Sequence, residues 1–265
     1  MIRFPGRETP TKGTDMTSTD LAGSTALVTG ATSGIGRATA TALARRGAHV
    51  LISGRDAARG DAAVAAIRAA GGKADFIRAD LADAGSVRAL ARRAAELGGG
   101  HVDILVNNAG VFPFGPTADA RDEDIDTVYD VNVKAPFILV GTLAPAMAAR
   151  GHGAIVNVLT MAARFGIAGM GLYGASKAAL TLLTQSWAAE FGPSGVRVNA
   201  VSPGPTRTEG TEPMGSQLDA LASLAPAGRP AAPEEIASAI SYLAGDEASF
   251  VHGAILDVDG GRNAA

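Results

Sequence analysis

Tyr173 and Lys177, four residues apart, are the side chains with the clearest capacity for acid–base chemistry. Residues at positions i and i+4 share a helix face, so we expect the phenol and the ammonium to be neighbours. A phenol with an ordinary pKa of about 10 exchanges protons poorly at neutral pH, and a nearby cation favours the phenolate. The pair therefore predicts a proton donor or acceptor. Taken alone, the same spacing also fits a surface tyrosine packed along a lysine stem.

Three glycines, Gly30, Gly34 and Gly36, indicate a second site. They follow a short apolar run and precede a helix-forming stretch over residues 37–46. A strand, a glycine turn and a helix in this order place free N–H groups and the positive end of the helix dipole beside an approachable backbone. The spacing is G-x-x-x-G-x-G, not the commoner G-x-G-x-x-G fingerprint. The turn predicts a dinucleotide-phosphate site; the alternative is a turn that uses glycine only to change direction.

The elements around these residues alternate between two patterns. Short runs rich in valine, isoleucine and leucine predict strands at 27–28, 49–53, 73–80, 102–106, 154–158, 196–201 and 254–258. The stretches between them predict helices at 37–46, 57–70, 84–97, 122–150, 173–191, 215–225 and 233–244, with kinks at Pro136 and Pro145. This alternation is typical of a parallel sheet covered on both faces. We expect an α/β, doubly wound fold with a single parallel seven-stranded sheet and helices on both faces.

Glycines, prolines and polar residues stand where the first six predicted strands end. In a doubly wound sheet the carboxyl ends of the strands meet at one edge, beside the cofactor crevice. In strand order these ends carry the glycine turn, Gly54-Arg55, Asp80-Leu81, Asn107–Gly110, Thr160 and Pro203-Gly204. Their convergence predicts one binding site at this edge.

The composition suits one folded domain after a polar start. Of the 265 residues, 47% are apolar and 18% are charged, which is enough to bury a full core. Residues 1–20 are polar and contain two prolines, so we expect a flexible tail, with Met16 as an alternative start. No linker-like stretch follows. We expect residues 21–265 to form a single dinucleotide-binding catalytic domain.

The composition also disfavours several functional classes. The formal net charge is −3 and the basic residues are scattered, so we expect neither nucleic acid nor a membrane surface as a partner. The absence of cysteine excludes disulfides and thiolate chemistry, and the four histidines lie far apart, so we expect no metal site. The longest strongly apolar segment, residues 137–149, is too short to span a bilayer, and no signal peptide is recognisable. We expect a cytoplasmic protein.

Five motifs occur together and in order: Thr29-Gly-x-x-x-Gly-Ile-Gly36, Asn107-Asn-Ala-Gly110, Tyr173-x-x-x-Lys177, Ser202-Pro-Gly204 and Val258-Asp-Gly-Gly261. In this set, which spans about residues 22–261, the chain resembles the single-domain short-chain dehydrogenases/reductases, which have a Rossmann fold. The resemblance implies that Tyr173 is the general acid in carbonyl reduction and the base in alcohol oxidation. It also implies that Lys177 lowers the pKa of Tyr173 and holds the nicotinamide ribose, and that Asn132 helps to order a water that relays protons.

One position departs from the pattern of that family. The family's catalytic serine aligns with Thr160 of this chain. Threonine keeps a hydroxyl that can bond a substrate carbonyl, but its methyl group stiffens χ1 and occupies space. We expect retained activity because Asn132, Tyr173 and Lys177 are all present. The alternative is an inactive homologue with threonine in its core.

The end of the second strand bears on the choice of cofactor. An acidic residue there bonds the 2′-hydroxyl of NAD, whereas an arginine accommodates the 2′-phosphate of NADP. The family's discriminating acid aligns with Gly54, and Arg55 follows it, so the sequence favours NADP over NAD. Two alternatives stay open. Asp56 would reach the ribose after a small shift, and Arg55 also fits a solvated loop residue.

The resemblance implies a longer set of cofactor contacts along the strand ends. The residues are Gly30, Thr32, Ser33, Gly34, Ile35 and Gly36 at the glycine turn, Arg55, then Asp80 and Leu81 at the adenine, then Asn107, Ala109 and Gly110 along the cofactor, then Tyr173 and Lys177, then Pro203, Gly204 and Thr206 at the nicotinamide, and finally Thr208. Asn107 and Asn108 also fit a structural role between strands, and the Ser202-Pro-Gly stretch also fits a plain turn.

The substrate side is specified less closely. Apolar loop residues either line a pocket above the nicotinamide or only pack the loops; they are Phe112, Pro113, Phe114, Phe165, Ile167, Met170, Leu172 and Met214. Arg164 and Arg207 are the candidate partners of an acidic substrate. The stretch 205–230, rich in proline and glycine at its start, is interpreted as a lid over the substrate.

Two functions are consistent with these observations. The first is an NADP(H)-dependent oxidoreductase that interconverts a carbonyl and a secondary alcohol of a small molecule; a 3-oxoacyl thioester, a sugar and a cyclic ketone are all open as substrates. The second is a non-catalytic dinucleotide-binding sensor or regulatory protein on the same fold. Members of the resembled family commonly pair through the helices around 122–150 and 173–191 and through the last strand. The resemblance therefore implies a homo-oligomer, a tetramer or a dimer.

Overall fold

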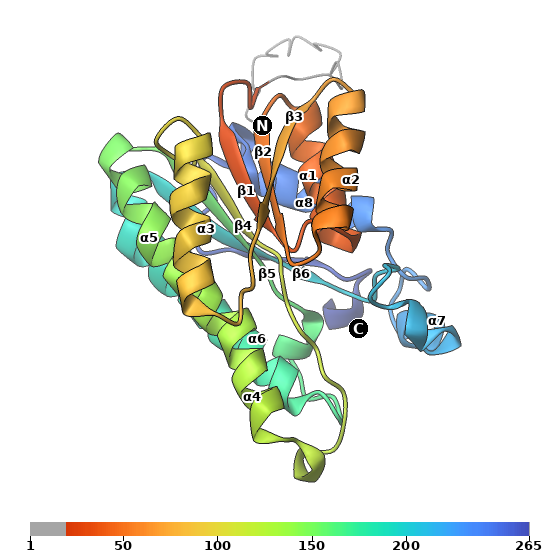
Figure 1. Ribbon diagram of the computed structural model, residues 1–265. Coiled ribbons are helices and arrows are strands. Elements are labelled where there is room, and N and C mark those ends of the chain that lie inside the picture. The colour runs from red at the N-terminus through yellow and green to blue at the C-terminus, as the bar shows by residue number, and fades with distance from the viewer. Residues whose placement is uncertain (1–19, 265) are drawn as a thin grey trace, which may run out of the picture.

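Seven buried or half-buried runs form one parallel sheet in the computed structural model, which describes residues 20–264 (Figure 1). Valine, isoleucine and leucine dominate these runs, because strands covered on both faces need apolar side chains on both sides. The strands are β1 (Thr25–Thr29), β2 (His49–Gly54), β3 (Lys73–Arg78), β4 (Ile104–Asn107), β5 (Gly153–Val158), β6 (Val196–Pro203) and β7 (Ile255–Val258). The predicted parallel seven-stranded sheet is confirmed, with small differences at the strand ends.

The order of the strands places a switch in direction at the centre of the sheet. The order is β3-β2-β1-β4-β5-β6-β7, so the chain runs outward from β1 to β3 and then returns to lay β4 on the other side of β1. The register pairs Ala26 with Ile104 and Val28 with Val106. Open α/β sheets bind ligands where the strand order reverses. The turn after β1 and the loop after β4 therefore flank the expected binding crevice.

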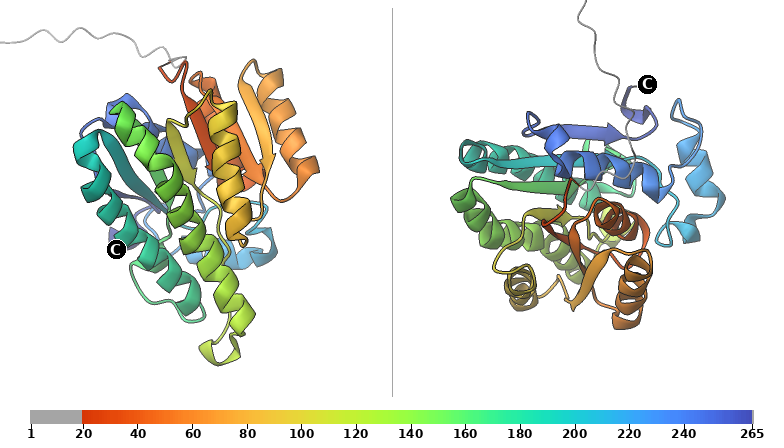
Figure 2. Two further views of the ribbon diagram at one scale, coloured as in Figure 1. Left: turned by 60° about the vertical axis from the view of Figure 1, so that its left-hand side comes forward. Right: turned by 90° about the horizontal axis from the view of Figure 1, so that it is seen from above.

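Two layers of helices cover the sheet. Helices α1 (Gly34–Arg45), α2 (Ala57–Ala69) and α8 (Pro233–Ala244) pack on one face and bury one apolar cluster. Helices α3 (Ala84–Leu97), α5 (Ala135–Arg150) and α6 (Gly171–Phe191) bury the second cluster against the other face, where Figure 2 (left) shows them side by side. The doubly wound arrangement predicted from the sequence is confirmed.

The helix expected over 122–150 is one continuous run with an irregular turn inside it. It comprises α4 (Asp122–Tyr129), a π-helical turn (Asp130–Lys134) and α5. Pro136 is the second residue of α5 and Pro145 lies within α5, so the helix continues through both positions where the sequence predicts kinks. The π turn carries Asn132, and turns of this kind are frequent at functional sites.

The same run passes a length and composition test for a membrane span. Its 29 residues include a window of mean hydropathy 1.4, of which 44% is buried inside the protein. This run is longer than the apolar segment 137–149 considered in the sequence. The buried residues of α5 pack against the sheet and α3, which accounts for its apolar character.

The segment between β6 and α8 lies outside the layered core. It contains a short 3₁₀ turn (Glu212–Met214) and α7 (Ser216–Ala222), which stands away from the sheet in Figure 1. This is the stretch that the sequence predicts to be a lid. The flexible tail expected over residues 1–20 lies outside the described residues except for Asp20.

Candidate active site

The glycine turn after β1 is locked against the loop after β4. The Asn108 side-chain amide donates to the carbonyls of Thr29 and Gly30, at 2.8 and 3.2 Å. The Thr29 hydroxyl accepts hydrogen bonds from the backbone N–H groups of Asn108 and Ala109, both at 3.1 Å. Because these bonds satisfy the turn from within, they hold its shape at the switch point of the sheet.

At each of the three glycines of the turn, a residue with a Cβ would be strained or would clash. Gly30 and Gly34 have φ of +62° and +50°, which side chains with a Cβ rarely adopt. A Cβ on Gly36 would lie 2.4 Å from both the Asn108 amide nitrogen and the Gly30 carbonyl oxygen. Gly30 and Gly36 therefore permit the turn to close on its neighbours, while Gly34 opens helix α1.

The N-terminus of α1 already holds an anion in this structure. The Gly34 N–H donates to a carboxylate oxygen of Glu209 at 2.9 Å, and Arg37 pairs with the other oxygen of that carboxylate at 2.6 Å. A free helix N-terminus favours negative groups through its N–H donors and its dipole. The donors therefore fit a phosphate, as the sequence predicts for this turn. The side chains of Thr32, Ser33 and Ile35 are half-buried in the same turn.

The end of β2 resolves the ambiguity that Asp56 introduces in the sequence. Asp56 caps helix α2: its carboxylate accepts from the backbone N–H of Arg59 at 3.0 Å and from its guanidinium at 3.1 Å. A Cβ on Gly54 would lie 2.6 Å from the Thr32 methyl group, so a longer acidic side chain has no room there. Arg55 is exposed, and Arg78 at the end of β3 donates to its carbonyl at 3.1 Å. Arg55 and Arg78 therefore bring positive charge to the end of β2, whereas the Asp56 carboxylate is engaged in capping α2.

The remaining strand-end residues divide into exposed and structural ones. Asp80 is exposed, and one of its carboxylate oxygens accepts from the Ala82 N–H at 3.1 Å, so the side chain folds back on its own turn. Asn107 is buried and donates to Asn157 at 2.8 Å, which supports the structural role left open for it in the sequence. Leu81 and Ala109 are half-buried and Gly110 is exposed.

The loop after β6 is held by its own hydrogen bonds. The Thr206 hydroxyl donates to the Gly204 carbonyl at 2.9 Å, and Thr211 contacts the Thr208 hydroxyl at 3.2 Å. A Cβ on Gly204 would lie 2.7 Å from the Asp259 Cα, so this glycine is required for close packing of the β6 and β7 ends. Pro203 is the last residue of β6. The structure thereby brings this loop to the same edge as the glycine turn.

Four polar side chains from α6, the π turn and the end of β5 form two pairs, Lys177 with Asn132 and Tyr173 with Thr160, which α6 joins. Lys177 is buried in α6, and its ammonium donates to the Val158 carbonyl at 2.8 Å. A Cβ on Gly110 would lie 3.3 Å from both the Lys177 ammonium and the Asn132 amide oxygen, so those two groups are neighbours. After the end of β5, Thr160 lies close enough to the Tyr173 hydroxyl to lower the pKa of that group. The structure brings together all four catalytic candidates of the sequence.

Asn132 acts as a clamp between the π turn, the loop after β4 and α6. Its amide oxygen accepts from the Val111 N–H at 2.9 Å, and its amide nitrogen donates to the Val111 carbonyl at 2.9 Å. The same nitrogen donates to the Ser176 hydroxyl at 3.0 Å. Asn132 is fully buried, so its polar atoms need these partners.

Burial sets the proton affinities of the central pair. It raises the pKa of Tyr173 to about 12, and the nearby Thr160 opposes that rise. Burial lowers the pKa of Lys177 to about 8. The expectation that Lys177 lowers the pKa of Tyr173 is therefore wrong for the protein in this state. Desolvation is the largest influence on the pKa of Tyr173, and the Lys177 ammonium is directed to the Val158 carbonyl.

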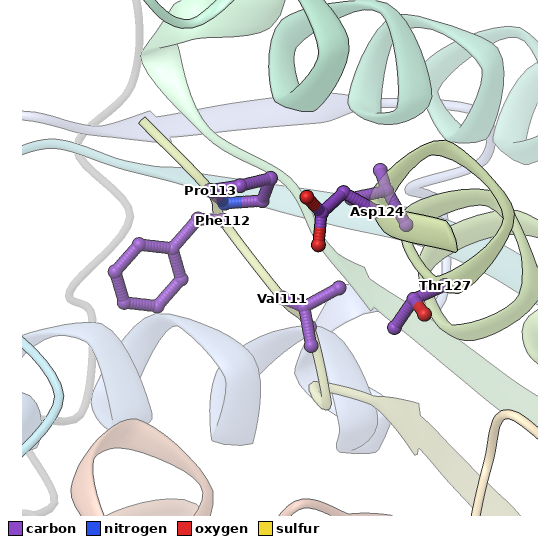
Figure 3. A pocket seen from close by; sticks show the side chains of 7 residues that line it. Val111, Phe112, Pro113, Asp124 and Thr127 are labelled. Atoms are coloured by element: carbon purple, nitrogen blue, oxygen red, sulfur yellow. The ribbon is translucent and has the colours of Figure 1, made fainter. Parts of the chain in front are cut away.

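A shallow cavity of about 380 Å³ lies next to these residues (Figure 3). Its lining comes from the loop after β4 and from α4, including Phe112, Asp124 and Thr127. The Phe112 ring lies 6.0 Å from the Tyr173 ring, centroid to centroid. Of the apolar residues proposed for the substrate side, Phe112 is thus the one in ring contact with a catalytic candidate, whereas Phe114 is 76% exposed.

Both arginines considered for an acidic substrate have carboxylate partners. Arg164 pairs with Asp257 at 3.1 Å, and Arg207 pairs with Asp219 at 2.6 Å. Arg262 lies over the Phe165 ring at 5.1 Å. The loop after β5 is therefore tied to β7 and to the C-terminal turn.

Three residues of the site were missed in the sequence: Arg78, Ser176 and Glu209. Ser176 lies within a recognised motif, and its type as a short hydrogen-bonding residue is the available signal. Glu209 contacts a residue 175 positions away, so no local pattern indicates it.

Comparisons with known proteins agree with this geometry. A family model described as Enoyl-(Acyl carrier protein) reductase matches residues 30–263. The chain is 44% identical to cis-4-hydroxycyclohexanecarboxylate dehydrogenase of Sinomonas cyclohexanicum over 245 residues, which is 90% of this chain and 96% of that protein. Among solved structures, a short chain dehydrogenase/reductase family protein is 51% identical with a TM-score of 0.87, and the match covers 93% of this chain and 100% of that one. A short chain dehydrogenase of Burkholderia cenocepacia in complex with NADP is 41% identical with a TM-score of 0.85, and covers 92% of this chain and 99% of that one.

Proposed function

The chain belongs to the short-chain dehydrogenase/reductase family and is an NAD(P)-dependent oxidoreductase, and from that premise we propose that it interconverts a ketone and a secondary alcohol with NADP(H). The observation that carries the proposal is the placement of Tyr173 where Thr160 acts on its hydroxyl, one helical turn from the buried Lys177. It joins a proton donor to a second polar group that can bond the same substrate oxygen. Threonine thereby supplies the hydroxyl that serine supplies in the family.

Several residues of this chain would hold the cofactor. The N–H groups that open α1 suit its phosphates, and Arg55 with Arg78 suits the 2′-phosphate of NADP. The blocked space at Gly54 and the capping role of Asp56 disfavour NAD, and a relative of known structure is in complex with NADP. When bound, the cofactor supplies or accepts the hydride.

In the proposed reaction the protein residues move one proton. The Tyr173 hydroxyl gives its proton to the carbonyl oxygen during reduction and takes it from the alcohol during oxidation. The Thr160 hydroxyl bonds that oxygen and orients it. The Lys177 ammonium favours the phenolate form of Tyr173 once the site is occupied. Asn132 holds the loop after β4 in place beside Lys177.

For the substrate we propose a neutral, mainly apolar cyclic alcohol or ketone. Arg164 and Arg207 are already paired with carboxylates, and the Phe112 ring lies against Tyr173. The relative from Sinomonas cyclohexanicum is named for a hydroxylated ring. Sugars and 3-oxoacyl thioesters are the other classes to test.

We also propose the domain organisation, the assembly and the location of the protein. Residues 21–265 act as one catalytic domain, and the active form is a homo-oligomer in the cytoplasm. Exposed apolar side chains on the outer helices support the assembly.

The test is a spectrophotometric assay with purified protein. NADPH oxidation at 340 nm is followed with cyclic ketones, sugars and a 3-oxoacyl thioester, and the series is repeated with NADH. Turnover is expected with NADPH and a cyclic ketone, and it should fall at least about 10²-fold in Tyr173→Phe, which keeps the ring but has no proton to give. Thr160→Ser is the matched control and should retain turnover.

Two results would contradict the proposal. Turnover by Tyr173→Phe at the wild-type rate would remove the tyrosine from the mechanism. NADPH binding without turnover of any carbonyl would support the non-catalytic sensor instead.

A further inference from the structure

A carboxylate from the lid segment lies at the N-terminus of α1. Glu209 follows Gly34 by 175 residues, yet its two oxygens contact the Gly34 N–H at 2.9 Å and the Arg37 guanidinium at 2.6 Å. Both of its oxygens are therefore engaged at the glycine turn. The side chain remains 46% exposed, so the contact can open without breaking a buried core.

Helix α1 has no anion of its own to place there. Its N-cap residue, Ser33, makes no side-chain capping bond, and its first turn, which is fully described, contains no acidic residue. A helix N-terminus attracts negative charge, so a distant carboxylate is stabilised at this position. The hydrogen bond from the Glu209 backbone N–H, the bond from Gly34 and the charge of Arg37 all lower the pKa of Glu209, so the group is an anion at neutral pH.

The contact fixes more than one side chain. The Cβ and methyl group of Thr208 lie 3.2 Å from the position of a Cβ on Gly34, so a second side chain of the segment packs closely against the turn. Thr211 donates to the Thr206 carbonyl at 2.8 Å, and Arg207 pairs with Asp219 of α7 at 2.6 Å. Because these bonds link the segment internally, Glu209 holds residues 206–222 as a unit.

We propose that Glu209 is an internal anion that competes with a phosphate of the cofactor for Gly34 and Arg37, and that it holds the lid segment 206–222 on the glycine turn until the cofactor displaces it. The inference rests on the proposed function, because it assigns the same N–H groups to the cofactor phosphates. It adds a coupling that the catalytic residues do not supply, since cofactor binding would release the segment that closes over the substrate.

A purely structural cap makes the opposite prediction. If Glu209 keeps its contact while the cofactor is bound, its charge either leaves the affinity unchanged or supports a turn that the cofactor needs. Neutralising it would then leave binding as it is or weaken it.

The experiment compares Glu209→Gln and Glu209→Ala with Glu212→Gln. Glu212 lies on the same segment, is exposed, and loses the same charge without touching α1. The dissociation constant of NADPH is measured by titration of its fluorescence, and Tm is measured with and without NADPH. We expect Kd to fall about three- to tenfold in both Glu209 variants and to stay within about twofold in Glu212→Gln.

The melting temperatures give a second readout. Without NADPH, Glu209→Gln should melt below the wild type because it loses the charge at the helix N-terminus, and its rise in Tm on adding NADPH should be larger. An unchanged or weaker affinity in both Glu209 variants, with normal NADPH binding by the wild type, overturns the inference and leaves the proposed function standing. Failure of the wild type and all variants to bind NADPH or NADH overturns the proposed function and this inference with it.

Discussion

At the scale of single residues, the chemistry of the site is set by burial. Tyr173 holds its proton more tightly than a free phenol and Lys177 holds its proton less tightly than a free amine, because burial disfavours the charged form of each. Tyr173 is therefore a protonated donor across the neutral range, which suits carbonyl reduction. Alcohol oxidation requires the phenolate, which is scarce until the pH rises.

This asymmetry predicts opposite pH profiles for the two directions. The fraction of phenolate grows about tenfold per pH unit below the pKa, so kcat/KM for oxidation should rise steeply between about pH 7 and 9. Reduction should stay level up to the pKa of Lys177, about 8, and then decline as the ammonium loses its charge. Initial rates at saturating cofactor, in buffers of constant ionic strength, give both profiles. A flat oxidation profile over the same range would contradict the assignment of Tyr173 as the titrating base.

The sequence predicts which residues meet, but not their proton affinities. The i, i+4 spacing and the motif set identify Tyr173 and Lys177, and both lie at the expected edge of the sheet. Desolvation depends on side chains and backbone from several strands and loops, such as the Val158 carbonyl that receives the Lys177 ammonium. Local spacing contains no information about those partners, and the predicted direction of the Tyr173 pKa is wrong for this reason.

At the scale of elements, the turn between β1 and α1 depends on the loop after β4. The Asn108 amide fills the space beside Gly36, and the Thr29 hydroxyl receives two N–H groups from that loop. The crevice is thus shaped by the contact between two strand ends at the switch point, not by the glycine motif alone.

Gly36→Ala tests that dependence. The added methyl group would lie 2.4 Å from the Asn108 amide and the Gly30 carbonyl, and a backbone carbonyl cannot move aside cheaply. We expect the free energy of unfolding to fall by about 1–3 kcal/mol, as for other overpacked sites, and NADPH binding to weaken. Urea denaturation measures the first and fluorescence titration the second.

Gly115→Ala in the loop after β4 is the matched control. A Cβ there meets nothing within 4 Å and the backbone φ is not positive, so stability should hold or rise by about 0.4–1 kcal/mol. If both variants unfold at the same urea concentration, the turn is not sterically constrained as described.

Elements with a regular apolar pattern were predictable, and irregular ones were less so. The strands and the core helices follow from their apolar runs and from capping residues such as Asp83, which accepts two N–H groups at the start of α3. The π turn that carries Asn132 has no distinct sequence pattern in this chain, because it is stabilised by tertiary bonds to Val111 and Ser176. The contact between Glu209 and α1 also has no local sequence pattern, because it joins residues 175 positions apart.

At the scale of the whole molecule, the layered fold leaves apolar side chains on its outer helices. Phe137 of α5 is 55% exposed and its ring lies 5.9 Å from that of Trp187 in α6, while Leu182 of α6 is 65% exposed. Figure 2 shows these two helices side by side on the outside of the sheet. Large exposed apolar groups on neighbouring helices are typical of an interface between subunits.

We therefore predict that the protein assembles through this face. The wild type should sediment as a dimer or tetramer at micromolar concentration, and the double variant Phe137→Glu with Leu182→Glu should shift to a smaller species, because two buried charges without partners oppose association. Leu224→Glu is the control: Leu224 is 57% exposed but lies just after α7, away from α5 and α6, so its change should leave the assembly intact. Sedimentation velocity resolves the species, and the residual fold is checked by circular dichroism. A monomeric wild type, or a double variant that keeps the wild-type sedimentation coefficient, would show that α5 and α6 do not form the interface.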